Sequence, residues 1–293
     1  MSDRASEVRR RLHYPVLGVA ALVASVTVFR EVLRQQARIA RRAIGVPLGE
    51  EAHVADRTYK KKYGARIELL LLGDSIAAGL GAEKPKRTLG AQLASRVAKT
   101  TGRAVRLRTA ARVGSESWEL AGQLESLPGG YVPDVVVIVV GGNDVTHRIR
   151  VAESTRHLAD AVAALRERGC EVVVGTCPDL GALLPVPQPL RSLAGRASRQ
   201  LATAQLQVVT ALGARAVSLA TVVGPFFVAQ PDEMFALDQF HPSGAGYRRT
   251  AKALLPSVLA ALGYRDDVPF GHHAPEPVTE RAEPEAAAGA GGR

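Results

Sequence analysis

The sequence predicts an α/β fold, a three-layer α/β/α doubly wound sandwich with a mainly parallel five-stranded sheet. From residue 66 onward, short apolar runs alternate with longer segments whose apolar residues recur at helical spacing. This alternation is typical of parallel strands that are covered by helices on both faces. The 293 residues and the hydrophobic content of 46% suit one globular domain with appendages.

The expected strands are the apolar runs, and the expected helices are the amphipathic stretches that follow them. The strands are expected at 67–73, 104–109, 134–140, 171–176 and 214–219, and the helices at 88–101, 116–126, 151–168, 191–212 and 244–262. Right-handed crossovers between such strands place binding and catalytic sites at the carboxyl ends of the strands.

Residues 1–65 are expected to form a basic segment outside the domain at 66–264. Of the formal net charge of +10, residues 1–66 contribute +8, with 14 Lys and Arg against 6 Asp and Glu. This asymmetry favours a segment near anionic lipid over a nucleic-acid-binding enzyme, and a solvated charge run is the alternative.

The N-terminal segment contains an uncharged, largely apolar run at 14–29. As a helix it would span about 24 Å at ~1.5 Å per residue, which is marginal for a bilayer core of about 30 Å. Apolar residues continue at helical spacing to Ile44 among arginines, as in a cationic interfacial helix. Membrane contact through residues 1–45 is therefore expected. A cleaved signal peptide, which would give a secreted protein, and a helix packed on the domain are the alternatives.

Residues 265–293 are rich in Pro, Glu and Ala without apolar periodicity, so a disordered tail is expected there.

The two cysteines, Cys170 and Cys177, flank an expected strand and are too far apart for a disulfide. Free thiols favour a reducing compartment and hence the cytoplasmic face of a membrane. Because no Cys/His cluster has zinc-site spacing, no metal is expected.

A serine on a turn after a buried strand is the strongest functional signal. Gly73-Asp74-Ser75 follows the apolar run 67–72, and Asp238 and His241 form an Asp-x-x-His pair near the other end of the domain. A serine hydroxyl becomes a nucleophile when a base takes its proton and a carboxylate orients that base. The sequence supplies all three side chains, although each block alone is also a common turn or helix cap.

Two further turns could supply donors for a developing oxyanion. These are Gly114 and Asn143, which lies in Gly-Gly-Asn-Asp after the strand at 134–140. Asn143 could instead cap a turn, and Asp74 and Asp144 are expected to be turn caps.

Together the four blocks resemble the SGNH (GDSL-type) hydrolases, over residues 66–264. The resemblance implies a flavodoxin-like fold and a catalytic triad of Ser75, Asp238 and His241. It also implies an oxyanion hole formed by the backbone N–H groups of Ser75 and Gly114 and the Asn143 side chain. The second block departs from the family because no asparagine precedes Gly114. A Gly-x-Ser-x-Gly elbow, which an α/β-hydrolase needs, is absent because Ala77 stands two residues after Ser75.

The resemblance therefore implies a serine esterase or lipase that works through an acyl-enzyme without a cofactor. The apolar, proline-rich stretch 183–190 and the cluster Phe226, Phe227, Met234 and Phe235 are candidate walls of an acyl groove or parts of the core. With a membrane-proximal N-terminus, they favour an acyl or lipid-like ester as substrate. The alternatives are an acyltransferase, a carbohydrate deacetylase and a catalytically silent, membrane-tethered binding domain.

Overall fold

A seven-stranded sheet forms the centre of the computed structural model, which describes residues 2–45, 48–49 and 51–276. The strands are β1 (Thr58–Tyr59), β2 (Arg66–Gly73), β3 (Ala104–Thr109), β4 (Val135–Val139), β5 (Glu171–Gly175), β6 (Arg215–Val217) and β7 (His272–His273), and their order in the sheet is β1-β3-β2-β4-β5-β6-β7. The five central strands are parallel.

This strand order defines where a site can form. Chain connections run to one side from β2 to β3 and to the other side from β4 onward, so the direction reverses between the neighbours β2 and β4. In a doubly wound sheet, ligands bind at the carboxyl ends of the strands at this switch point. The residues that follow β2 and β4, namely Ser75 and Asn143, therefore lie on its two sides.

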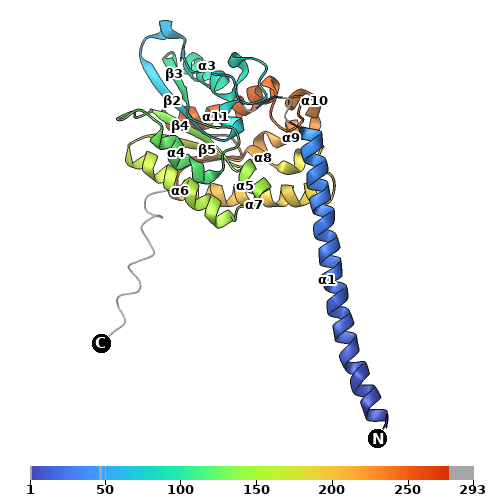
Figure 1. Ribbon diagram of the computed structural model, residues 1–293. Helices are drawn as coiled ribbons and strands as arrows, with labels where there is room; N and C mark the ends of the chain where they lie inside the picture. Colours follow the sequence, from blue (N-terminus) through green and yellow to red (C-terminus); the bar gives the residue numbers. More distant parts are fainter. Residues whose placement is uncertain (1, 46–47, 50, 277–293) are drawn as a thin grey trace, which may run out of the picture.

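Helices cover both faces of the sheet, as three layers require (Figure 1). On one face lie α3 (Leu89–Thr101) and α11 (Gly244–Ala261), whose apolar side chains pack with the alternate strand residues Leu69, Leu71 and Val137. On the other face α4 (Leu120–Glu125), α6 (Val151–Glu167) and α7 (Leu190–Ala211) pack with Leu70, Leu72 and Val136. The strands are thus buried on both sides, which explains their continuous apolar runs.

Apart from the N-terminal helix, the remaining helices are short and lie mostly in the loops around the carboxyl ends of the strands. They are η1 (Lys61–Tyr63), α2 (Ser75–Ala78), η2 (Pro85–Arg87), η3 (Ser117–Glu119), α5 (Gly142–His147), η4 (Leu180–Ala182), α8 (Leu219–Val222), α9 (Gly224–Ala229) and α10 (Pro231–Met234).

The predicted three-layer fold and its five parallel strands are confirmed, with two differences in the elements. The sheet is mixed, because β1 and β7 add antiparallel edges to β3 and β6. The stretch 116–126 forms the 3-10 turn η3 followed by α4. Two-residue strands are too short to carry an alternating pattern, so no run of residues in the sequence indicates them.

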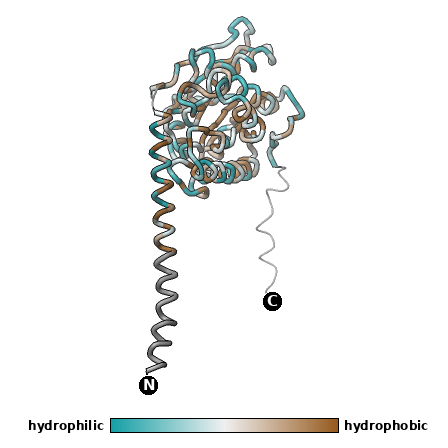
Figure 2. The backbone as a smooth tube through the Cα atoms, turned by 90° about the vertical axis from the view of Figure 1, so that its right-hand side faces the viewer, coloured by the Kyte–Doolittle hydropathy of each residue, from teal (hydrophilic) through white to brown (hydrophobic). Residues whose placement is uncertain are grey.

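The N-terminal helix is longer than the predicted apolar run. Helix α1 (Ser2–Ile44) projects from the domain in Figures 1 and 2, and its side chains are described from Leu22 onward. Its last turns pack on the domain: Ala40 is buried beside Leu183 and Val186, and the Gln36 Oε1 accepts a hydrogen bond from the Leu190 N–H at 3.0 Å. Within the described part of the chain, no helix has the length and hydropathy needed to cross a bilayer.

Both predicted boundaries of the domain shift outward. Strand β1 lies within the expected N-terminal segment 1–65, and β7 lies within the expected tail 265–293. The tail strand is held by the Ser257 hydroxyl, whose Oγ lies 2.8 Å from the His272 Nδ1. Of the expected tail, residues 277–293 lie outside the described residues.

Candidate active site

A sharp turn at the end of β2 presents Ser75. The backbone of Gly73 has φ +124°, and a Cβ atom there would lie 1.9 Å from the carbonyl oxygen of Val139 on β4. Only glycine fits this close approach of two strands. Asp74 then caps α2 by accepting a hydrogen bond from the Ile76 N–H at 2.9 Å, as the sequence predicts. Ser75 is the first residue of the helix.

The Asp-x-x-His pair approaches Ser75 from a closed loop between α10 and α11. An antiparallel bridge between Phe235 and Pro242 ties the ends of this loop. The His241 Nε2 lies 3.0 Å from the Ser75 Oγ, and the His241 Nδ1 lies 2.6 Å from the Asp238 Oδ2. The structure therefore brings Ser75, His241 and Asp238 together in one hydrogen-bonded chain.

The environment of Asp238 favours its ionised form. Burial raises the pKa of this carboxyl. Hydrogen bonds from the His241 side chain and from the backbone N–H groups of Phe240 and His241 lower the pKa by more than burial raises it, so the net pKa lies below the ordinary value. An ionised carboxylate at the Nδ1 fixes the ring with the proton on that nitrogen. The Nε2 is then free to accept a proton from the Ser75 hydroxyl.

Asp74 is a second buried carboxyl at the site, and its pKa moves in the opposite direction. Burial raises the pKa of Asp74 to about 7, against hydrogen bonds from the Ile76 and Gly142 N–H groups and the charge of His241, while Asp144 adds to the rise. By bonding both N–H groups, the carboxyl connects the turn after β2 with the turn after β4.

Asn143 faces the same pocket as Ser75. Its side-chain Nδ2 donates to the Ser115 carbonyl oxygen at 2.9 Å, and α5 has no side-chain cap, so Asn143 is not the cap of this helix. An amide Nδ2 carries two protons, and the second is available to a ligand. Asp144 binds the start of a turn, as expected, but of a turn elsewhere in the chain, because its carboxylate accepts from the Ser117 N–H, the first residue of η3.

Gly114 lies outside the group formed by Ser75, Asn143 and His241. It has φ +83° in the exposed turn Arg112–Ser115, where a Cβ atom would meet nothing within 4 Å. In the described chain its N–H donates to no protein acceptor. Gly114 does not line the pocket that contains Ser75, Asn143 and His241.

Gln123 is a site residue that the sequence analysis missed. Its fully buried side chain accepts from the Gly73 N–H and donates to the Gly73 carbonyl oxygen, both at 2.8 Å. It also donates to the Ser115 Oγ at 3.2 Å. Gln123 thus holds the turn before Ser75 close to Ser115, whose carbonyl oxygen accepts from the Asn143 amide. In the sequence it is one polar residue of an amphipathic helix, so no pattern distinguishes it.

An apolar cavity of about 80 Å³ adjoins Ser75 and His241. Leu183, Phe227 and Phe235 line it, as the sequence analysis suggested for an acyl groove, together with Leu180 and Phe240. The other candidates lie elsewhere: Met234 is core, Phe226 carries the Arg249 guanidinium on its ring, and Leu184 is exposed.

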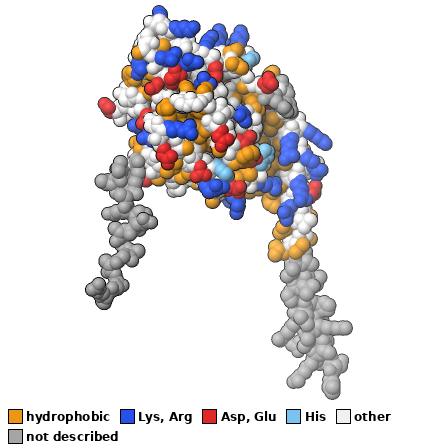
Figure 3. All heavy atoms as spheres, turned by 60° about the vertical axis from the view of Figure 1, so that its left-hand side comes forward, with side chains coloured by type: hydrophobic (Ala, Val, Ile, Leu, Met, Phe, Trp, Pro, Cys, Tyr) orange, Lys and Arg blue, Asp and Glu red, His pale blue; other side chains and the backbone are white. Residues whose placement is uncertain are grey.

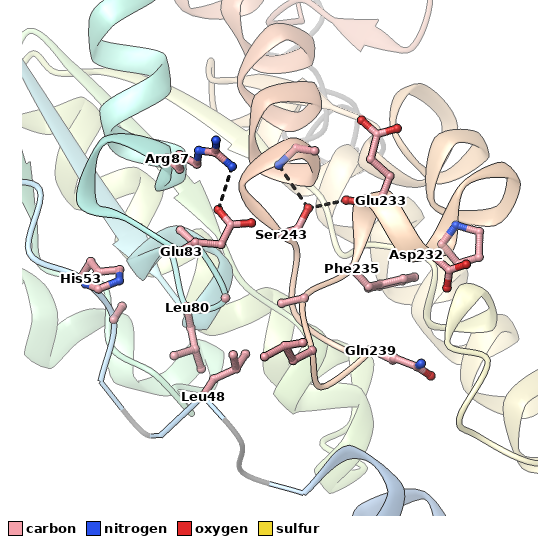
Figure 4. Close-up of a pocket in the computed structure, with 18 of the residues that line it drawn as sticks. Leu48, His53, Leu80, Glu83, Arg87, Asp232, Glu233, Phe235, Gln239 and Ser243 are labelled. Carbon is pink, nitrogen blue, oxygen red and sulfur yellow. Dashed lines mark hydrogen bonds and ion pairs between the residues drawn. The ribbon is translucent and has the colours of Figure 1, made fainter.

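A larger cavity of about 900 Å³ shares Phe235 with the cavity beside Ser75 (Figure 4). Its polar wall includes Glu83, paired with Arg87 at 3.3 Å, and Glu233, whose carbonyl oxygen accepts from the Ser243 hydroxyl. Ser75 and His241 do not line it, so we assign it no part in bond cleavage.

The fold and the site define a class of protein, the hydrolases of ester bonds built on a flavodoxin-like sheet. Comparison with known proteins gives the family. The model of the GDSL-like lipase/acylhydrolase family matches residues 71–249, and the chain belongs to this family. It is 39% identical over 219 residues to a GDSL-like esterase of Mycobacterium tuberculosis, covering 74% of this chain and 70% of the relative.

Solved structures support the same fold. The lipase/acylhydrolase from Enterococcus faecalis aligns with a TM-score of 0.53 and 21% identity, over 69% of this chain and 100% of that one. A variant of an acetyl xylan esterase from Geobacillus stearothermophilus aligns with a TM-score of 0.52 and 18% identity, over 70% and 98%. The chain is therefore a GDSL-type (SGNH) hydrolase that acts on esters.

Proposed function

We propose that the protein is a serine esterase whose catalytic triad is Ser75, His241 and Asp238. The observation that carries this proposal is the hydrogen-bonded chain from the Ser75 Oγ through the imidazole to Asp238. His241 takes the Ser75 proton at Nε2 while the Oγ attacks the ester carbonyl carbon. The protonated His241 then gives its proton to the leaving alcohol as the carbon–oxygen bond breaks, which leaves Ser75 acylated. A water molecule, deprotonated by His241, releases the acid and restores the hydroxyl.

The negative charge that develops on the carbonyl oxygen needs donors already in place. The Ser75 N–H and the second proton of the Asn143 Nδ2 are available for it, since neither is used within the described protein. The Gly114 N–H is the third proposed donor. This N–H donates to no protein acceptor among the described residues, so it is available to a bound ester.

The cavity beside Ser75 supports a short acyl group. A dry cavity of about 150 Å³ accommodates benzene, so about 80 Å³ corresponds to roughly three carbon atoms. We infer an acyl chain of about two to four carbons, which narrows the acyl or lipid-like ester expected from the sequence. Such acyl groups include the acetyl group of the acetyl xylan esterase named above, so deacetylation of a carbohydrate is a second candidate function.

A series of p-nitrophenyl esters from acetate to palmitate tests the chemistry and the acyl length together. Each buried methylene contributes ~0.8 kcal/mol, or about fourfold, so kcat/KM should rise by this factor per carbon up to butyrate and then stop rising. Ser75→Ala should reduce hydrolysis to background while its circular dichroism is unchanged. Near-normal turnover by Ser75→Ala would exclude the triad, and the highest kcat/KM on palmitate would exclude the short acyl pocket.

Two other readings of the same site are separated by the same assay. An acyltransferase would use every residue of the triad and would transfer the acyl group to an added alcohol faster than to water. Membership of a family of ester hydrolases argues against the second alternative, a catalytically silent binding domain, which would show no hydrolysis and no labelling of Ser75 by a phosphonate.

We also propose that α1 attaches the enzyme to an anionic membrane surface. The side chains of residues 22–32 are exposed and include Leu22, Val28 and Phe29. Arginines follow them along the same helix, and Figure 3 shows these basic side chains gathered beside exposed apolar ones. Apolar and cationic residues together are typical of helices that bind at a lipid interface. The cytoplasmic face is the proposed side, and secretion after signal cleavage is the alternative.

A further inference from the structure

A basic groove runs between β1 and α3, away from Ser75. Its volume is about 490 Å³. One wall is the face of α3 that carries Ser95, Arg96 and Lys99, and the other wall is the segment 57–60. Strand β1 pairs with Arg106 and Val105 in the amino-terminal half of β3, whereas Ser75 follows the carboxyl end of β2. The groove is therefore distinct from the ester site.

The groove is strongly positive. Its lining includes five cationic side chains and no carboxylate, the cations being Arg57, Lys60, Lys86, Arg96 and Lys99. Within the described part of the chain, none of the five forms an ion pair, whereas the neighbouring Arg87 is paired with Glu83. The contact recorded for the Arg57 guanidinium is with the Tyr59 ring, at 4.7 Å from its centroid.

Arg96 is the most constrained of these cations. Its Nε is buried without a hydrogen-bond partner in the described structure. Burial and the neighbouring charge of Arg248 lower its pKa. The Ser95 hydroxyl beside it makes no hydrogen bond to the described protein, so a donor is available there as well. Like charges gathered in a concave, partly desolvated site repel one another, and a bound anion would remove that cost.

We propose that this groove binds a multivalent anion with several phosphoryl groups. The groove lining extends along α3 from Ala91 to Lys99, about 12 Å at ~1.5 Å per residue. Its cations come from three separate segments, the stretch 57–60, η2 and α3, which suits linked phosphoryl groups better than a single ion. Guanidinium and ammonium groups are the side chains that bind phosphate most strongly.

The lining also indicates the source of the phosphoryl groups. The one aromatic residue of the groove, Tyr59, is buried and covered by Arg57, so there is no free ring on which a nucleobase could stack. In Figure 1, α3 and β3 lie at the end of the domain opposite to the free part of α1. A membrane held by α1 would therefore not meet the groove, so the proposed ligand is a soluble polyphosphorylated anion.

Calorimetric titration of the full chain with inorganic tripolyphosphate tests the proposal. We expect saturable binding of one anion at low ionic strength, with a dissociation constant that increases steeply with salt. Lys86→Gln/Lys99→Gln removes two exposed cations of the groove and should weaken binding at least about tenfold. The matched control is Arg168→Gln/Lys252→Gln, which removes the same charge from exposed residues outside the lining and should change binding little.

Three outcomes would overturn the proposal. The first is equal weakening by both double variants, which would mean attraction to net charge alone. The second is the absence of saturable binding to the wild type. The third is that phosphatidylglycerol vesicles bind through Lys86 and Lys99 while tripolyphosphate does not, which would assign the groove to a membrane. Hydrolysis of p-nitrophenyl acetate should be unchanged in both double variants, and Ser75→Ala should bind the anion normally, so this test is independent of the proposed esterase activity.

Discussion

Asn143 has two separable roles if it belongs to the proposed oxyanion hole. Its Nδ2 already donates one proton to Ser115, and the second is proposed to stabilise the oxyanion. Asn143→Ala should therefore lower kcat by roughly 10²–10³ with little change in KM, because the second bond strengthens in the transition state. Loss of the Ser115 bond should cost only about 1 kcal/mol of stability. Steady-state kinetics and a thermal melt on one preparation measure both effects.

Thr146→Ala is the matched control for this variant. The Thr146 hydroxyl donates to the Asn143 carbonyl oxygen on the same short helix, so its removal perturbs α5 without touching the Asn143 amide. We expect kcat to be retained in this control. If Asn143→Ala were destabilised but kept its kcat, Asn143 would be a structural residue only.

The buried carboxyl of Asp74 predicts a pH-dependent stability. Its pKa is raised to about 7, above the value of ~3.9 in an unfolded chain, so the folded protein binds more protons than the unfolded one between these values. The contribution of Asp74 to stability is complete below pH ~4 and is lost as pH rises through about 7. Asp74→Asn keeps a good helix cap and cannot titrate.

The free energy of unfolding of the wild type, relative to Asp74→Asn, should therefore fall as pH rises from 4 to 8. The upper limit of this fall is about 4 kcal/mol, at ~1.36 kcal/mol per pKa unit. Urea unfolding at several pH values measures it, and Asp266→Asn provides a control at an exposed carboxyl. Parallel stability curves for wild type and Asp74→Asn would contradict the raised pKa.

The sequence predicted Ser75, Asp238, His241 and Asn143 because their positions after strands, or in a short motif, are visible in it. The structure brings these four together, whereas Gly114 stays outside the lining of the pocket. Gln123 and the link from Asp74 to Gly142 were not predictable. Both depend on contacts between segments that are far apart in the chain, and neither leaves a pattern in its own segment.

At the element scale, the strand–turn–helix unit around Gly73 makes a sharp prediction. Gly73→Ala would place a Cβ 1.9 Å from the Val139 carbonyl oxygen, so either β4 or the serine turn must move. We expect a loss of about 3 kcal/mol or more of stability and of most activity. Gly114→Ala is the comparison, because it shares a positive φ but has open space around it, and it should cost only about 1–2 kcal/mol.

Chemical unfolding and ester hydrolysis on both variants test this contrast. Ala at position 114 keeps its backbone N–H, so activity per folded molecule should be preserved there. Equal stability of the two variants would mean that the turn tolerates a side chain at Gly73 and that its close approach to β4 does not fix the position of Ser75.

Long elements were predicted from the sequence better than short ones. The elements at 88–101, 151–168, 191–212 and 244–262 extend over several turns, so their apolar periodicity is repeated often enough to set both ends. By contrast, β1, β7 and the 3-10 turns have two or three residues each. Their existence depends on pairing and capping partners elsewhere in the molecule, and local pattern does not reveal those partners.

At the scale of the whole molecule, the distribution of charge is the point on which the sequence and the structure differ most. The sequence assigned the basic residues before position 66 to one segment outside the domain. In the structure they divide into two groups, because α1 carries the arginines up to Arg42 while Arg57 and Lys60 line the groove at the edge of the sheet. A linear charge count cannot separate groups that folding places on different parts of the molecule.

This division determines how the membrane proposal is best tested. Removal of residues 1–60 would delete β1 together with the helix, so a cleaner truncation removes residues 1–30. It deletes the apolar run at 14–29 and keeps the docked end of α1, including Gln36 and Ala40. The truncated protein should no longer sediment with phosphatidylglycerol vesicles, while its kcat/KM on p-nitrophenyl acetate is preserved.

The full-length variant Arg34→Gln/Arg38→Gln separates the electrostatic attraction of the arginines from the hydrophobic contribution of the apolar side chains to this attachment. Both arginines are exposed on α1, and each basic residue near an anionic surface contributes ~1 kcal/mol, so the double variant should bind the vesicles roughly thirtyfold more weakly but still measurably. Its binding should also depend less on salt than that of the wild type. If the truncated protein sediments as well as the full chain, α1 is not the attachment site, and its exposed apolar side chains must have another partner.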